Sequence, residues 1–410
     1  MTVARRADDK QMGRCYIAIA ARPGTLAGHT PRRRLRLSRQ KLTCQRDSSR
    51  SRGLHAGAQR TRTLALLTCT LLTSIVVQAD DKLLRIISWA DYVPADVIGE
   101  FKKQTGIQVQ VTLSNNEEMI SKLRATGGAG FDLAQPSQDR ILGAQQEFRI
   151  YKPLDTSKVH LEEFVPELLD TVRKNATVDG KLYALPYVWG TEGLVYNSRR
   201  TTIADYRDLC KGELRGRTAV RLKRPTLMAF ALALGKNPFA LYGDTRAYSA
   251  LMDEVGRTLI ACKANFRFFY DNKDQLLNGV RSGEIYAAMM WDSGGWLLNR
   301  ENPEIKFINP RSGAIAWMDT FALPARGRND AAAYAWINFV MRPEIAARVA
   351  RSIGNFTAAR GADQLIDPRV RAQFATTFPE GLKNIKWYPA IPPGLEEIEG
   401  AVLDRIKAAN

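Results

Sequence analysis

Hydrophobic and polar positions follow two different periodicities from residue 83 onward, one typical of strands and one typical of helices. Residues 83–89 are mostly apolar, which is typical of a short buried strand. A helical pattern begins at Pro94 and ends at Gly106, a residue that commonly terminates helices. Apolar and polar residues then alternate over 107–113, which predicts a second strand.

The same order of elements continues for another 20 residues. Asn116 is placed to cap a helix that ends at Gly127, and residues 131–134 read as a third strand. Strands that alternate with helices at this spacing predict parallel βαβ units with right-handed crossovers. Ligands of such sheets bind beyond the carboxyl ends of the strands, which selects the loops at 89–92 and 136–137.

The rest of the chain keeps the α/β pattern, without internal repeats. We expect a loop at 292–295, directly after a strand that carries Trp291. The further expected strands are 218–222, 285–291 and 314–323, and the expected helices are 225–235, 274–279, 330–341, one opened by Pro343, and 395–408.

A different kind of segment precedes the first strand. Arg60 and Arg62 stand before the apolar run 64–77, and small residues lead to Ala79. This pattern predicts a signal peptide over 60–79 that is cleaved after Ala79. A membrane anchor is disfavoured because spanning needs about 20 apolar residues. Cys69 raises the alternative of a lipoprotein, although the apolar run continues beyond it.

Residues 1–59 show no periodic apolar pattern and are rich in arginine. Two interpretations stay open, a translation start placed too early or a disordered basic tail, and neither gives this segment a fold. The leader also explains the basic composition. Residues 1–79 carry a net charge of +13 out of the total of +18. The remainder has no clustered basic face, so no nucleic-acid partner is predicted.

Cysteine and histidine usage limits the possible chemistry. After Ala79 only Cys210 and Cys262 remain, and the sequence leaves open whether they form a disulfide outside the cytoplasm. His160 is the sole histidine of that part, so neither a metal site nor a Ser-His-Asp triad is predicted. Nucleophile-elbow, P-loop and dinucleotide motifs are absent, and we expect a protein without cofactors that is not an enzyme.

Several separate motifs resemble a known family. Residues 87–92 with 100–107, residues 130–137, residues 185–197, and residues 276–291 with 313–324 are similar, in this order, to the spermidine/putrescine-binding proteins of ABC importers. The resemblance spans about 82–360. It implies a periplasmic, two-lobed α/β binding-protein fold of type II-like organisation, with the ligand cleft between lobes that close by hinge motion.

The resemblance also implies how the lobes divide. Residues 82–187 and 318–360 would form the first lobe, and residues 188–317 with part of 361–410 the second. A polyamine would lie between them, held by carboxylates at its ammonium ends and by aromatic faces along its methylenes. The expected ligand-binding residues are Trp89, Asp91, Tyr92, Ser137, Thr226, Trp291, Asp292, Trp317, Asp319 and Phe356.

Each of these residues has a structural alternative. Trp291 and Trp317 lie near strand ends, where aromatic side chains usually belong to the core. Asp91 stands before Pro94 and could cap the helix there. Asp319 is harder to explain structurally, since a carboxylate within an apolar segment is costly unless it is paired.

The sequence departs from the family at three positions. Where relatives have acids, this chain has Thr226 and Gly294, and Phe356 replaces an aromatic hydroxyl. Lys223 and Arg224 flank the expected helix start, which itself favours anions. The resemblance predicts a monomer that delivers a putrescine- or spermidine-like polyamine to an importer permease. The departures raise the alternatives of an ω-amino acid or an acylated polyamine, and a role as a ligand sensor also stays open.

Overall fold

The computed structural model describes residues 82–409, which start with a small parallel sheet. Its strand order is β2-β1-β3, formed by β1 (Leu83–Ser88), β2 (Gln108–Leu113) and β3 (Leu133–Ala134). Both strand pairs are parallel, as predicted. Helices α1 (Ala95–Thr105) and α2 (Asn116–Thr126) make the two crossovers. The cap of α2 is Asn115 rather than Asn116, because the Asn115 side chain accepts a hydrogen bond from the Glu118 amide.

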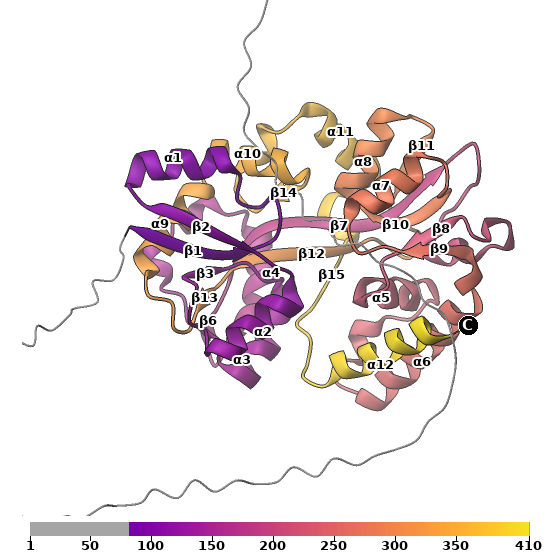
Figure 1. Cartoon of the computed structure of the whole chain (residues 1–410), viewed down its shortest axis with the longest axis horizontal. Helices are drawn as coiled ribbons and strands as arrows, with labels where there is room; N and C mark the ends of the chain where they lie inside the picture. Colours follow the sequence, from indigo (N-terminus) through magenta and orange to yellow (C-terminus); the bar gives the residue numbers. More distant parts are fainter. Residues whose placement is uncertain (1–81, 410) are drawn as a thin grey trace, which may run out of the picture. The chain divides into compact units, whose positions relative to one another are not determined.

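A larger mixed sheet occupies the middle of the chain (Figure 1). Its strand order is β15-β12-β7-β10-β8-β9, and β11 and β14 also pair with β7. The bounds of these strands are β7 Leu185–Asn197, β8 Thr218–Val220, β9 Phe266–Phe269, β10 Ala287–Trp291, β11 Ile305–Ile308, β12 Ile315–Phe321, β14 Phe356–Thr357 and β15 Lys386–Trp387.

Strands β7 and β12 join the two sheets. They run antiparallel side by side, and the far end of β12 reaches the small sheet through bridges from Ser137 to Asp319 and from Ala134 to Ala322. The expected lobe boundaries at 187/188 and 317/318 fall within these two strands. Long shared strands of this kind can serve as the hinge between lobes. The exact division of the chain into lobes stays a prediction.

The buried side chains gather into two cores. Phe101 and Trp336 belong to one core, which extends from the small sheet, whereas Phe230 and Tyr248 belong to the other, beside β8 and β10. Helices supply much of both cores. The remaining α-helices are α3 Ile141–Phe148, α4 Pro166–Ala176, α5 Arg224–Ala233, α6 Thr245–Ala261, α7 Lys273–Arg281, α8 Asp292–Glu301, α9 Asp330–Val340, α10 Pro343–Ile353, α11 Pro368–Thr377 and α12 Leu395–Ala408.

Short elements complete the description. Strands β4 Tyr151–Lys152 and β13 Leu323–Pro324 pair with each other, as do β5 Thr177–Val178 and β6 Lys181–Leu182. The expected loop at 292–295 is wrong, because these residues form the first turn of α8 directly after β10. Two glycines do not prevent this turn, since Gly294 and Gly295 pack closely against Met290 and Phe307.

Cys210 and Cys262 form a disulfide, which answers the question that the sequence left open. It joins the end of the 3-10 helix η4 (Tyr206–Cys210) to the end of α6. Within residues 82–409, no helix has the length and apolar character needed to cross a membrane. The expected signal peptide at 60–79 and the segment 1–59 lie outside the described residues.

Candidate functional site

A cleft of about 350 Å³ lies where the loops of the two sheets face each other. Residues from the loop after β1, from the 3-10 helix η1 (Gln138–Arg140) after β3, and from the segment after β8 line it. The last residue of β10 and two residues within β12 add further side chains. This position agrees with the rule that open α/β sheets bind ligands beyond the carboxyl ends of their strands.

Asp319 is the most deeply buried of the predicted carboxylates that line the cleft. Its side chain accepts hydrogen bonds of 2.5 Å from the hydroxyl groups of Ser137 and Tyr92. Burial raises the pKa of Asp319 to about 7, although both hydrogen bonds act in the opposite direction. A carboxylate can accept about four hydrogen bonds, so Asp319 keeps acceptor capacity toward the cleft. A cation bound there would stabilise the ionised form.

The loop after β1 brings Trp89 and Asp91 to the same cleft. The indole N–H of Trp89 donates to the carbonyl of Gln135 at 2.9 Å, which fixes the ring. Asp91 has a left-handed backbone (φ 68) and an exposed side chain. Pro94 occupies the N-cap position of α1 and no side chain caps that helix. The capping alternative for Asp91 is therefore not what the structure shows, and its carboxylate remains available at the rim.

Trp291 and Trp317 line the cleft from the larger sheet. The ring of Trp317 lies against Gly190, and no hydrogen-bond partner for its buried indole nitrogen is found in the described part of the chain. The ring of Trp291 is covered by the guanidinium of Arg221, 5.0 Å from the ring centre. Both indoles are only partly buried, so they contribute surface to the cleft as well as to the core.

Three of the expected residues do not line the cleft. Asp292 is fully buried, and its carboxylate accepts hydrogen bonds from Thr191, Ser293 and Asn355. The Asp292 carboxylate is therefore already occupied by these donors. It points toward β7 because Asp292 lies in the N-terminal turn of α8. The cleft receives Ser293 and Asn355 in its place.

Thr226 and Phe356 lie behind the cleft wall. The Thr226 hydroxyl, in the first turn of α5, donates at 2.5 Å to the carbonyl of Arg221, which precedes the helix. Phe356 stacks on Trp189 at 4.9 Å, because β14 pairs with β7 at that residue. The remaining seven expected residues line the cleft: Trp89, Asp91, Tyr92, Ser137, Trp291, Trp317 and Asp319.

The sequence did not single out Glu192, which also lines the cleft. Its side chain is buried, with the guanidinium of Arg221 at 4.0 Å. Burial raises the pKa of Glu192 to about 7, while Arg221 and a hydrogen bond to Trp291 oppose the shift. The signal that marked Asp319, a carboxylate inside an apolar strand, was present here too.

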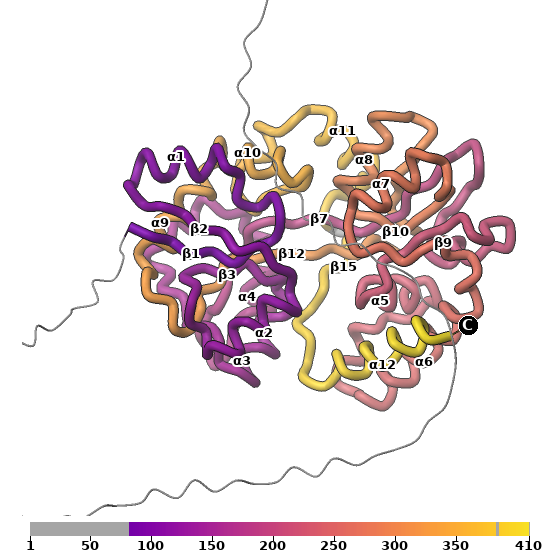
Figure 2. The backbone as a smooth tube through the Cα atoms, viewed as in Figure 1, coloured from indigo at the N-terminus to yellow at the C-terminus, as the bar shows by residue number. Residues whose placement is uncertain are grey.

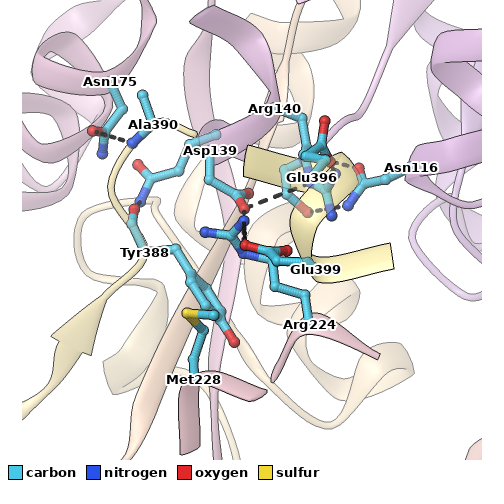
Figure 3. Close-up of polar contacts among 12 residues, drawn as sticks. Asn116, Asp139, Arg140, Asn175, Arg224, Met228, Tyr388, Ala390, Glu396 and Glu399 are labelled. Atoms are coloured by element: carbon cyan, nitrogen blue, oxygen red, sulfur yellow. Dashed lines mark hydrogen bonds and ion pairs between the residues drawn. The ribbon is translucent and has the colours of Figure 1, made fainter. Parts of the chain in front are cut away.

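Asp139, Arg140 and Arg224 form a charged part of the cleft (Figure 3). The sequence indicated Arg224 beside the helix start but neither Asp139 nor Arg140. Arg224 is buried and bonds to Glu399 of α12 at 2.9 Å, and Asp139 of η1 lies 3.9 Å from it. Asp139, Arg224 and Glu399 are far apart in the sequence, so no local pattern could have predicted their contacts. Because Arg224 has its own acidic partners, it is not free to attract an anionic ligand.

The fold and the cleft together define a protein that binds a small solute between two lobes. A family model described as bacterial extracellular solute-binding protein matches residues 96–376, and the chain belongs to this family. The Escherichia coli (strain K12) spermidine/putrescine-binding periplasmic protein is 30% identical over 317 residues, which cover 75% of this chain and 87% of that protein.

Two further relatives agree with this assignment. Putrescine-binding periplasmic protein PotF of Escherichia coli (strain K12) is 29% identical over 314 residues, with coverage of 72% of this chain and 82% of that protein. Among solved structures, the spermidine/putrescine ABC transporter substrate-binding protein PotD from Streptococcus pneumoniae superimposes with a TM-score of 0.65 at 24% identity. That match covers 80% of this chain and 98% of that chain, and it supports the two-lobed fold.

Proposed function

We propose that this protein captures an aliphatic polyamine, of the putrescine or spermidine kind, in the periplasm and delivers it to the permease of an ABC importer. The relatives with 29% and 30% identity carry putrescine or spermidine in their names. The observation that supports the proposal most directly is Asp319, a buried carboxylate that faces a cleft lined by three indole rings.

The chemistry of the cleft suits an ammonium group. Charge-assisted hydrogen bonds to a carboxylate are about twice as strong as neutral ones, and they gain strength as closure removes water. Trp89 and Trp317 offer apolar faces that can cover methylene groups and attract a cation. Ser137 and Tyr92 hold the Asp319 carboxylate in place, so little freedom would be lost on binding.

The same proposal covers the partner and the location. The binding protein would act as a monomer outside the cytoplasm, after removal of residues 1–79, and it would carry its ligand to the permease without transforming it. The cleft offers carboxylates and indoles to a solute but no histidine to act as a base, since His160 is not among the lining residues.

Calorimetric titration with putrescine, spermidine and 4-aminobutyrate tests the proposal. We expect heat and a single site with one or both polyamines, and no turnover of the bound amine on prolonged incubation. At a ligand concentration 100 times the dissociation constant, the protein should gain about 2.7 kcal/mol of stability. Tighter binding of 4-aminobutyrate would favour the ω-amino acid alternative, and no heat from any of the three compounds would contradict the proposal.

A further inference from the structure

Glu192 and Asp319 lie on one face of the larger sheet. Strand β7 lies beside β12 (Figure 1), and Glu192 stands opposite Ile315 while Trp317 stands opposite Gly190. Opposed residues of an antiparallel pair point to the same side, and so do alternate residues along one strand. Glu192, Trp317 and Asp319 therefore share the face that lines the cleft.

The register also sets their spacing. Four residues along β12 separate the position of Glu192 from Asp319, which corresponds to roughly 13 Å. The Trp317 ring lies between the two carboxylates because Gly190 leaves space for it. This spacing is a separation of backbone positions, and both side chains reach into the cleft between them. With a hydrogen bond of about 2.8 Å at each end, a spacing of this order suits a short linear diamine better than a longer triamine.

Glu192 has the surroundings of a carboxylate that can receive a cation. The Glu192 side chain is 5% exposed. Glu192 lies on β7, directly opposite Trp291 of the neighbouring strand β10. Arg221 is its single ion-pair partner among the described residues, at 4.0 Å. That distance is longer than a direct hydrogen bond, so the pair leaves Glu192 with acceptor capacity.

Arg221 limits what can lie beyond Glu192. Its guanidinium covers the ring of Trp291, so a cation of the protein already occupies the aromatic surface at this end. The side chain is 17% exposed and lines the cleft. A longer amine would need the same aromatic face and would bring another ammonium close to the guanidinium, where like charges repel.

We propose that Glu192 holds the second ammonium group of a short linear diamine and that Arg221 closes this end of the cleft against longer triamines. This inference rests on the proposed function, and it assigns the preference for a diamine over a triamine to Glu192 and Arg221. One ammonium binds at Asp319, the methylenes cross Trp317, and the other ammonium binds at Glu192. The protein therefore prefers putrescine to spermidine.

Calorimetric titrations of the wild-type protein and of two variants test the proposal. We expect putrescine to bind the wild type more tightly than spermidine does. Glu192→Gln should weaken putrescine binding about tenfold or more, because one charged acceptor is lost. Arg221→Met should raise the affinity for spermidine relative to putrescine by severalfold, because it removes the positive charge and frees the ring of Trp291.

A surface pair provides matched controls. Arg267 and Glu284 form an exposed ion pair outside the cleft, so Glu284→Gln and Arg267→Met should leave both affinities unchanged. Thermal melting shows whether each variant is folded, and Arg221→Met keeps the proposal testable if Glu192→Gln does not fold.

Two kinds of failure are distinguishable. If putrescine binds the wild type but Glu192→Gln changes its affinity less than twofold, Glu192 is only a structural partner of Arg221 and this inference is overturned. Spermidine that binds the wild type as tightly as putrescine also overturns it. If neither amine binds the wild type, the proposed function itself fails.

Discussion

Asp319 combines burial with two short hydrogen bonds at the wall of the cleft. Taking a carboxylate out of water disfavours its charged form, and this desolvation is the main cause of its raised pKa. The hydroxyl groups of Ser137 and Tyr92 offset only part of that cost. The side chain is therefore better satisfied with a cation beside it, which is the property that a receptor for amines requires.

The raised pKa predicts how affinity depends on pH. With a pKa of about 7, Asp319 is mostly ionised at pH 8 and mostly protonated at pH 6. Because an ammonium binds the ionised form, protonation of Asp319 alone should lower polyamine affinity about tenfold from pH 8 to pH 6, and protonation of Glu192, whose pKa is also about 7, should add to this fall. The folding stability of the protein without ligand should change in the opposite direction, being higher at the lower pH. The contribution of Asp319 to stability is full below its unfolded pKa of about 3.8 and is lost as pH rises through 7.

Titrations of ligand across this pH range, with Asp319→Asn beside the wild type, check the prediction. The variant should bind more weakly at pH 8 and show a shallower pH dependence. Asp404→Asn, at an exposed position on α12, is the control and should match the wild type. An affinity that does not change between pH 6 and pH 8 would contradict the assignment of Asp319.

Sequence reasoning found the cleft residues that follow strands and missed those that need tertiary packing. Trp89 and Asp91 follow β1 at its carboxyl end, where a general rule places ligands. Glu192 carried the same signal as Asp319, a carboxylate within an apolar segment, but it was not predicted because the family resemblance implied ligand-binding residues at other positions. Arg221 could not be placed from the sequence, since only the fold shows that its guanidinium covers Trp291.

At the scale of elements, β7 and β12 carry the floor of the cleft. Gly190 of β7 stands opposite Trp317 of β12, and the ring of the tryptophan occupies the space above the glycine. A β-carbon at position 190 would lie 2.6 Å from the Cζ2 atom of Trp317 and 2.5 Å from the Nδ2 atom of Asn355. The backbone of one strand thus positions the aromatic surface on the next.

Gly190→Ala should displace the Trp317 ring and weaken amine binding about tenfold, because the methylene contacts depend on that ring. Calorimetric titration measures the loss, and circular dichroism shows whether the sheet is retained. Gly99→Ala is the control, since a β-carbon at position 99 in α1 would meet no atom within 4 Å. A Gly190→Ala protein that binds as tightly as the wild type would show that Trp317 does not contact the ligand.

The elements themselves were largely predictable. The βαβ pattern gave β1, α1 and β2 within one or two residues, because their apolar periods are undisturbed. The start of α8 could not be predicted, because Asp292, Ser293 and two glycines form a typical loop sequence. Tertiary contacts decide this segment, because the Asp292 carboxylate binds Thr191 of β7 and thereby anchors the first turn.

At the scale of the whole described chain, the C-terminal segment connects both sheets. After β15 the chain hydrogen-bonds to η1 and α4, and it then forms α12, which lies along α6 (Figure 2). The amide of Ile391 donates to the carbonyl of Asp139, and the amide of Ala390 donates to the side chain of Asn175. This crossing was not predictable, because nothing local in residues 386–395 indicates which distant elements they contact.

The buried ion pair between Arg224 and Glu399 predicts a large contribution of α12 to the stability of the folded protein. Arg224 and Glu399 are both buried, 2.9 Å apart, and Tyr248 donates a further hydrogen bond of 2.5 Å to Glu399 (Figure 3). Removing one partner of a buried pair costs about 3–5 kcal/mol when the other charge is left without compensation. Asp139, 3.9 Å from Arg224, would remain as an acidic partner, so Glu399→Gln should lower the free energy of unfolding by an amount toward the lower end of this range, as measured by denaturant titration.

Glu396 on the same helix provides the matched control. It pairs with Arg140 through a side chain that is half exposed, so Glu396→Gln should cost less than about 1 kcal/mol. The contrast between two glutamates one turn apart separates burial from charge, because both substitutions remove the same negative charge from α12. If Glu399→Gln destabilises the protein no more than Glu396→Gln does, the C-terminal helix is not fastened through Arg224, and its packing against α6 must hold it in place.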